Sequence, residues 1–377
     1  DGQTIGYTYN VLTDNVNGRT LQGFSLQAEE RMYRCEGGCP YSTYQKFYKY
    51  YGVFDYANQW ILSAFDGKST SFANGNADFS MYTEVGRGEA IKKGSAYMSV
   101  WMYIIRELEA AIHECKNDCT VANCNDEPVN SWDEGVAFYT GSLEGTDGSG
   151  QGVFPYSLAD KRCENFRTCG DLAEETSGTS HVNIQILAQF VDGKRNLLAG
   201  KCDAARQNKE RIEQLMAVPL VQGTIRYAYV TDLGNDPSEK PEAEGATFAA
   251  AVLPLVSACD EDAATTIYNN MKVGQNGAAN FVTVKNAFES VYACMNIRCA
   301  DVGGLYDATT GDYMNHAQPC GSTESSSNSK TVGLAVGLSI GGVALIAIIV
   351  LLSRRYCGSH SNVTTNTDVA GGDKMVA

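Results

Sequence analysis

Acidic side chains next to aromatic ones are the first feature of this sequence that could bind a ligand. The stretch 130–152 reads NSWDEGVAFYTGSLEGTDGSGQG and brings Asp133, Glu134 and Tyr139 into a few turns of predicted helix. Carboxylate and phenolate oxygens are hard donors, which suit a hard cation such as ferric iron. Helix capping is the alternative, because Ser131 and Glu134 have the spacing of a capping box, with Asp133 in the first turn.

A second segment repeats this pattern. Residues 243–253 (AEGATFAAAVL) and 133–143 (DEGVAFYTGSL) share a Glu-Gly pair, a Phe and a Leu at equal spacing. In the second copy Glu244 shares a predicted helical face with Phe248, so this acid must find a partner or lose its charge. Glu134 and Glu244 could meet between two helical halves and bind a metal ion. Capping or ion pairing of both acids is the alternative.

A third acid, Glu107, lies on an apolar helical face with Tyr103 one turn before it. The two residues form either a Tyr/Glu ligand pair or a buried hydrogen bond or salt bridge. Glu109 and His113 lie four residues apart on the polar face, which favours a solvated pair. The HEC sequence at His113 lacks the second His of a zinc protease, and no P-loop occurs. We therefore predict no catalytic residues and no enzymatic activity.

Apolar residues recur at helical spacing through most of the chain before residue 321, and the alternation typical of strands is scarce. We predict an all-α ectodomain of residues 1–320. Because of the repeat, we expect two related helical-bundle halves, at about 1–202 and 203–320, packed about a pseudo-dyad. Four tyrosines at helical spacing are predicted to belong to its core: Tyr41, Tyr44, Tyr48 and Tyr51.

The cysteine content indicates an exported domain with disulfide bonds. The chain has 13 Cys, and only Cys357 follows the apolar run described below, which leaves an even number in the predicted ectodomain. The sequence does not fix how these cysteines pair. Three close pairs could form local disulfides: Cys35/Cys39, Cys163/Cys169 and Cys294/Cys299.

Residues 332–352 (VGLAVGLSIGGVALIAIIVLL) carry no charge over a length that can cross a bilayer. Arg354 and Arg355 follow the run and, by the positive-inside rule, place the tail 353–377 in the cytosol. A Ser-rich stalk at 321–331 precedes the run. We predict a single-pass type I protein of the plasma membrane with an extracellular N-terminal domain, and we expect its signal peptide to have been removed.

Two overlapping G-x-x-x-G steps, formed by Gly333, Gly337 and Gly341, favour a homodimer through the predicted span. The ordinary frequency of glycine in membrane spans is the alternative explanation. The net charge of −15 argues against a nucleic-acid partner, because binding to phosphates requires a cationic face.

The segment SWDEGVAFYTGSLEG (131–145) resembles the signature of the algal low-iron-inducible, or iron-assimilating, proteins. The membrane-anchored members of that family are the phytotransferrins. The resemblance covers the predicted ectodomain from about residue 21 to 320, and the stalk, span and short tail fit the anchored branch. It implies capture of ferric iron at the cell surface with carbonate as synergistic anion. It also implies endocytosis and release of the metal in an acidified compartment such as an endosome.

The resemblance transfers only Asp133 and Glu134 by position. Together with the residues above, it leads us to predict the Fe(III) ligands Glu134, Glu244, Asp133, Tyr139, Glu107 and Tyr103. Carbonate would need cationic donors, for which Arg106 and Arg226 are the candidates. Acid would protonate the carbonate and the carboxylates, so that the metal leaves. Two other functions stay open, a surface adhesion or structural protein without a metal site and an unrecognised ectoenzyme.

Overall fold

The computed structural model describes residues 20–36, 38–118, 127–141, 154–274 and 279–321. These residues are mostly helical and belong to one compact unit, which confirms the predicted helical class. Within these ranges no helix combines the length and the apolar character that a bilayer span requires. The predicted span, the tail and Gly333, Gly337 and Gly341 lie outside them. The division into two related halves stays a prediction.

The elements follow one another in three stretches of chain. The first contains α1 (Leu21–Leu26), the π-helical turn η1 (Glu29–Tyr33), α2 (Ser42–Tyr51), α3 (Tyr56–Asp66) and the 3-10 turn η2 (Phe79–Met81). The second contains α4 (Glu84–Gly94), the π-helical segment η3 (Ser95–Val100), α5 (Trp101–Asp118), α6 (Glu127–Thr140), α7 (Pro155–Phe166) and α8 (His181–Leu198). The third contains α9 (Cys202–Thr231), α10 (Glu239–Ser257), α11 (Glu261–Met271), α12 (Phe281–Val291), α13 (Cys299–Val302) and the antiparallel strands β1 (Tyr306–Asp307) and β2 (Asp312–Tyr313).

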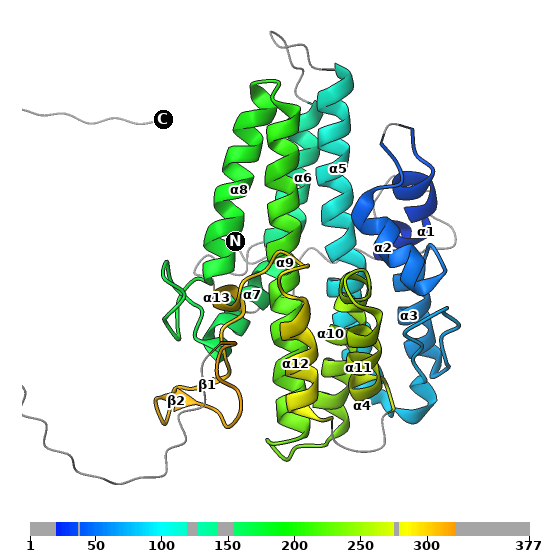
Figure 1. Cartoon of the computed structure of the whole chain (residues 1–377). Coiled ribbons are helices and arrows are strands. Elements are labelled where there is room, and N and C mark those ends of the chain that lie inside the picture. The colour runs from blue at the N-terminus through cyan, green and yellow to red at the C-terminus, as the bar shows by residue number, and fades with distance from the viewer. Residues whose placement is uncertain (1–19, 37, 119–126, 142–153, 275–278, 322–377) are drawn as a thin grey trace, which may run out of the picture. The chain divides into compact units, whose positions relative to one another are not determined.

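Two long helical rods organise the fold (Figure 1). One consists of α4, η3 and α5, which follow one another without a break, and the other is α9, with 30 residues. At one end α5, α6, α8 and the first part of α9 pack together. At the other end α4, α10, α11 and α12 pack with the rest of α9. Each rod therefore takes part in both groups of helices.

The repeated Glu-Gly pair marks a close helix crossing in both copies. A Cβ added to Gly135 of α6 would lie 2.8 Å from Leu108 Cδ2 of α5. A Cβ added to Gly245 of α10 would lie 2.8 Å from Tyr227 Cβ of α9. Real Cβ atoms do not approach other atoms so closely, so each glycine lets its helix approach one of the two rods.

The phenylalanine of each repeat packs against a tyrosine of a rod. The ring centroids of Phe138 and Tyr103 are 5.1 Å apart in an edge-to-face arrangement. Phe248 stacks on Tyr227 at 5.9 Å and on Tyr97 at 5.2 Å. Such aromatic pairs stabilise the contact beyond the area that they bury. The repeat thus fixes one buried tyrosine of each rod beside a helix that carries a glutamate.

Every described cysteine is in a disulfide, and the bonds are Cys35–Cys39, Cys115–Cys202, Cys163–Cys169, Cys259–Cys294 and Cys299–Cys320. The predicted pairs Cys35/Cys39 and Cys163/Cys169 are confirmed, whereas the pair Cys294/Cys299 is wrong. Cys294 follows the end of α12 and meets Cys259 beyond the end of α10. Cys299 begins α13 and is bonded to Cys320 instead.

The capping box of Ser131 and Glu134, considered above as the alternative to a ligand site, does not occur in α6. The described helix already begins at Glu127, with Pro128 in its first turn, a position that suits the fixed φ of proline. Ser131, Asp133 and Glu134 therefore lie inside the helix, more than one turn after its start.

Glu109 is buried, contrary to the solvated pair predicted with His113. Its Oε1 lies 2.6 Å from Lys209 Nζ, and its Oε2 lies 3.1 Å from Arg206 Nη1. Lys209 Nζ also lies 3.2 Å from Glu213 Oε1. The face of α5 that looked polar in the sequence is thus covered by α9, which supplies the cations. This network joins the two rods through charges that neutralise one another.

A steric prediction follows from the packing of α8 on α6. A Cβ added to Gly193 would overlap the ring of Trp132, which is fully buried. Gly193→Ala should lower the free energy of unfolding by about 1–3 kcal/mol, because the core must expand around the methyl group. A Cβ added to Gly88 of α4 has no neighbour, so Gly88→Ala should raise the free energy of unfolding by about 0.5–1 kcal/mol. Urea denaturation monitored by circular dichroism measures both, and equal effects would contradict the packing.

Candidate metal and anion site

The structure distributes the eight predicted site residues over both groups of helices. Tyr103, Arg106 and Glu107 lie on α5, and Asp133, Glu134 and Tyr139 lie on α6, whereas Arg226 and Glu244 lie on α9 and α10. In the described structure α6 packs on α5, α7 and α8, and α10 packs on α4, α9 and α11 (Figure 1). Glu134 and Glu244 therefore belong to different groups, and the structure does not bring these two glutamates together as predicted.

The residues of α5 form a closed cluster. Arg106 Nη1 donates to Glu107 Oε2 at 2.6 Å, and the Glu107 side chain is 1% exposed. The Arg106 guanidinium lies 5.7 Å from the centre of the Tyr103 ring, which also stacks on Phe24 at 3.7 Å. Of the two roles left open for Glu107, the structure contains the buried salt bridge. Its partner is the arginine predicted to bind the anion, so that charge is already used.

The residues of α6 have separate partners. Asp133 is exposed, and its Oδ2 lies 2.7 Å from Lys194 Nζ. The Tyr139 hydroxyl donates to Asn183 Oδ1 at 2.5 Å, and burial raises the pKa of Tyr139 well above its usual value. Glu134 is half-buried on the same helix. These contacts do not join the three residues into one site.

Glu244 is held by a chain of polar contacts from three other helices. Lys93 Nζ of α4 lies 3.1 Å from Glu244 Oε1, and the Tyr227 hydroxyl of α9 donates to the same carboxylate. Arg162 of α7 donates in turn to the Tyr227 oxygen. The Glu244 site, defined here as Lys93, Arg162, Tyr227 and Glu244, thus brings a carboxylate and a phenol into contact between two cations. Arg226 lies 4.9 Å from the centre of the Tyr227 ring.

The close crossing of α9 and α10 creates this contact. Gly245 leaves room for Tyr227, as described above, and Gly223 of α9 leaves room for Phe248, since a Cβ there would lie 2.8 Å from the ring. Each helix thus contributes one glycine and one aromatic side chain to the crossing. A larger residue at either glycine would push the two helices apart and separate Tyr227 from Glu244.

The charges of the site follow from its surroundings. Burial raises the pKa of Glu244, but the charge of Lys93 and the hydrogen bonds from Tyr227 and Lys93 outweigh it, so this pKa lies below its usual value. Burial and the negative charge of Glu244 raise the pKa of Tyr227 to about 12. Glu244 is therefore ionised at neutral pH and Tyr227 is a neutral phenol. A strong Lewis acid would be needed to ionise Tyr227 there.

Sequence reasoning found Glu244 and Arg226 but missed Lys93, Arg162 and Tyr227. A signal existed for Arg162, which lies on the same predicted helical face as Leu158 and Phe166, both buried in the structure. A cation on an apolar helical face needs a partner for its charge, as the acid Glu244 does. Lys93 carried no such signal, because α4 is weakly amphipathic and Lys93 stands next to the exposed Lys92.

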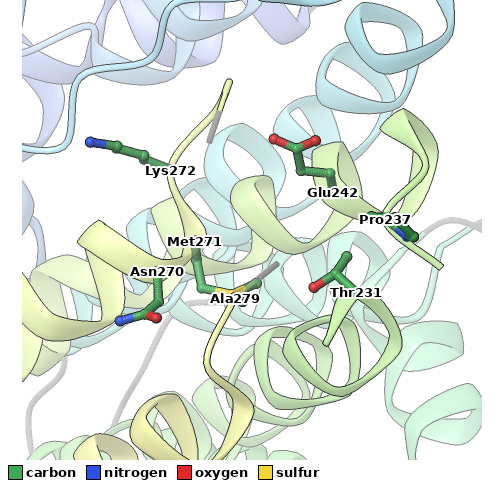
Figure 2. A pocket seen from close by; sticks show the side chains of 7 residues that line it. All are labelled: Thr231, Pro237, Glu242, Asn270, Met271, Lys272 and Ala279. Carbon is green, nitrogen blue, oxygen red and sulfur yellow. The ribbon is translucent and has the colours of Figure 1, made fainter. Parts of the chain in front are cut away.

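No group of three or more His, Cys, Asp or Glu residues that could hold a metal ion occurs in the described ranges. A metal at the Glu244 site would therefore need tyrosine oxygen and an external ligand. Another cavity, of about 60 Å³, is lined by Thr231, Glu242 and Met271 among other residues (Figure 2). Lys272 points away from Glu242 in this view, so the two charged side chains that line this cavity do not form a pair like that of Lys93 and Glu244.

The depressed pKa of Glu244 predicts how the stability of the protein depends on pH. The ionised carboxylate stabilises the fold above the pKa of the unfolded state, and this contribution is lost as pH falls through the folded-state pKa. Glu244→Gln should lower the free energy of unfolding at pH 7 by about 1–3 kcal/mol. The difference from the native chain should shrink as the pH is lowered from 5 to 3 in urea titrations. Asp133→Asn, at an exposed pair, should cost less than about 1 kcal/mol, and a pH-independent effect of Glu244→Gln would contradict this origin.

Comparison with known proteins identifies no family for this chain. No protein-family model matches it, and neither a curated protein nor a solved structure matches it. Its function is therefore inferred from the chemistry of the Glu244 site.

Proposed function

We propose that this protein captures ferric iron together with carbonate at the cell surface and delivers it for uptake by endocytosis. The proposal rests on the contact between the Glu244 carboxylate and the Tyr227 phenol, with cations on both sides. Ferric iron prefers anionic oxygen ligands, and a carboxylate and a phenolate in contact supply two of them. Carbonate would supply further oxygen atoms. The resemblance of segment 131–145 to the phytotransferrins supports the same cargo.

Loading of iron would require two changes in the site. The metal would displace the proton of Tyr227, and the guanidinium groups of Arg162 and Arg226 would stabilise the phenolate. The metal would also replace Lys93 at Glu244. Because Tyr227 has a pKa of about 12, loading would release a proton at neutral pH, and the affinity for iron would rise with pH.

Lys93 has a second carboxylate within reach when it leaves Glu244. Glu89, one turn earlier on α4, has its Oε2 4.0 Å from Lys93 Nζ. This buried oxygen has no hydrogen-bond partner in the described structure. Lys93 could therefore move from Glu244 to Glu89 with a small change of rotamer. That exchange would expose Glu244 to the metal and keep the ammonium group paired.

The cations around the site explain why an anion would accompany the metal. Lys93, Arg162 and Arg226 would repel a bare ferric ion, and one carboxylate does not compensate for them. Carbonate bound to the arginines would reverse the sign of the local potential. Tyr97 lines a cavity beside the Glu244 site together with Lys93, Arg162 and Tyr227. It lies close enough to Arg162 to affect the pKa of that residue, and it offers a second phenol. In acid, protonation of carbonate and Glu244 would release the metal.

Titration of the full-length protein in detergent with ferric iron tests this proposal directly. With bicarbonate present, a tyrosinate-to-iron charge-transfer band should appear in the visible spectrum, and without bicarbonate it should not. Tyr227→Phe should lose most of the band, and Glu244→Gln should lower the affinity at least tenfold, because each removes a ligand. Tyr229→Phe, on the same helix, is the matched control and should leave the band unchanged.

Each other outcome has a definite meaning. Iron retained without the band would indicate carboxylate ligands alone. If no iron is retained in either buffer, the proposal fails and an adhesion or structural role replaces it.

The competition between Lys93 and the metal gives a second prediction. Lys93→Met removes the cation that iron must displace from Glu244, so iron should bind on the order of tenfold more tightly at pH 7. For the same reason the pH of half-release should fall. Lys68→Met removes an ammonium group that is 71% exposed and paired with Asp66, and it should change neither value. Iron release followed by absorbance during acid titration measures both. A weaker affinity in Lys93→Met would mean that Lys93 holds the anion instead.

A further inference from the structure

The cavity beside the Glu244 site is positively charged, although the whole chain has a net charge of −15. Its volume is about 60 Å³, several times what one water molecule requires. The polar residues that line it are Lys92, Lys93, Tyr97, Lys161, Arg162 and Tyr227. The cavity therefore has room for an ion of four or five heavy atoms, and no carboxylate of the described residues lines it.

Arg162 distinguishes this cavity from a group of surface lysines, because its guanidinium group is buried. It is 8% exposed, and its Nε and Nη1 atoms are buried without a hydrogen-bond partner among the described residues. Its remaining contacts are with the hydroxyl and the ring face of Tyr227. Arg226 adds a second positive charge nearby, and no ion pair of Arg162 with a described acid occurs. Leaving a guanidinium buried and incompletely hydrogen-bonded is costly, and an anion in the cavity would offset that cost.

We propose that this cavity binds inorganic phosphate, and that it does so in the absence of iron. Arg162 would donate from inside the cavity through the two nitrogens that have no partner. Lys92 and Lys161, which are exposed, would meet the anion at the mouth. Lys93 stays with Glu244 in this state, so the Glu244 site does not have to open.

The charge of the cavity favours phosphate over hydrogen carbonate. At neutral pH phosphate carries more charge than hydrogen carbonate and has four oxygens for the surrounding donors, and affinity for a cationic cavity rises with anion charge. Carbonate gains its second charge chiefly when a metal binds it. The inference goes beyond the proposed function, because phosphate binding requires neither the metal nor the ionisation of Tyr227. If both proposals hold, phosphate competes with carbonate-assisted loading of iron.

Isothermal titration of the full-length protein in detergent with inorganic phosphate tests the inference. The buffer contains a chelator, no bicarbonate and little salt. One phosphate should bind per chain in a saturable manner. Arg162→Met should weaken binding at least tenfold, and Lys92→Met, an exposed change that spares the core, should weaken it at least threefold. Arg195→Met, an exposed residue on α8 paired with Asp192, changes the net charge equally and should leave the affinity within twofold.

Several results would overturn the inference. The native chain could show no saturable binding, or Arg162→Met and Lys92→Met could both bind as tightly as the native chain. A parallel titration with bicarbonate should show binding at least tenfold weaker than phosphate. If bicarbonate displaces phosphate at equal concentration, the cavity is a carbonate site and the phosphate inference is wrong. Because no iron is present, this test can fail while the iron band appears, and it can succeed while the band is absent.

Discussion

The close crossing of α9 and α10 is the constraint on which the rest of this structure depends. Gly223 and Gly245 let the two helices approach until the aromatic side chain of each fills the space left by the glycine of the other. Without that approach, Tyr227 would not reach the Glu244 carboxylate. The close packing of α9 and α10 thus brings the Glu244 carboxylate into contact with the Tyr227 hydroxyl. Hydrogen bonds from Lys93 of α4 and Arg162 of α7 then hold these two groups in place.

In the described structure, a buried cation is compensated by acids near the start of the α9 rod but not near its end. Near its start, Lys209 is fully buried but lies between Glu109 and Glu213, so its charge is compensated and the network holds the rods together. Beside its last turns, Arg162 of α7 is almost as buried, but its hydrogen bond is to the neutral phenol of Tyr227, and the nearby charge of Arg226 adds to its own. The first arrangement is complete without a ligand. The second calls for an anion, and this difference distinguishes a structural network from a binding site.

The sequence predicted the helices better than the site. Helical periodicity follows from local spacing, so the class of fold could be predicted from it. Short separation along the chain suggested the disulfides Cys35–Cys39 and Cys163–Cys169, but it also suggested the wrong pair Cys294/Cys299. The partner of Glu244 could not be predicted, since Lys93 lies 151 positions earlier and no local rule joins them. The repeat around Glu134 and Glu244 was a real signal, but its shared element is the Gly and Phe of a helix crossing. The two glutamates lie in different groups of helices.

The π-helical segment η3 sets how the two ends of the first rod face their neighbours. A π-helical turn accommodates about one more residue than an α-helical turn, so η3 takes up one extra position while α4 and α5 keep nearly the facing of an uninterrupted α-helix. Deletion of one residue from η3 would be absorbed by a return to α-helical hydrogen bonding, and Lys93 would stay beside Glu244. The same deletion within the α-helical part of α5 would turn the preceding part of the rod by about 100° and separate the two residues. Over evolution η3 is therefore the part of this rod in which a single codon can be lost while the Glu244 site stays intact.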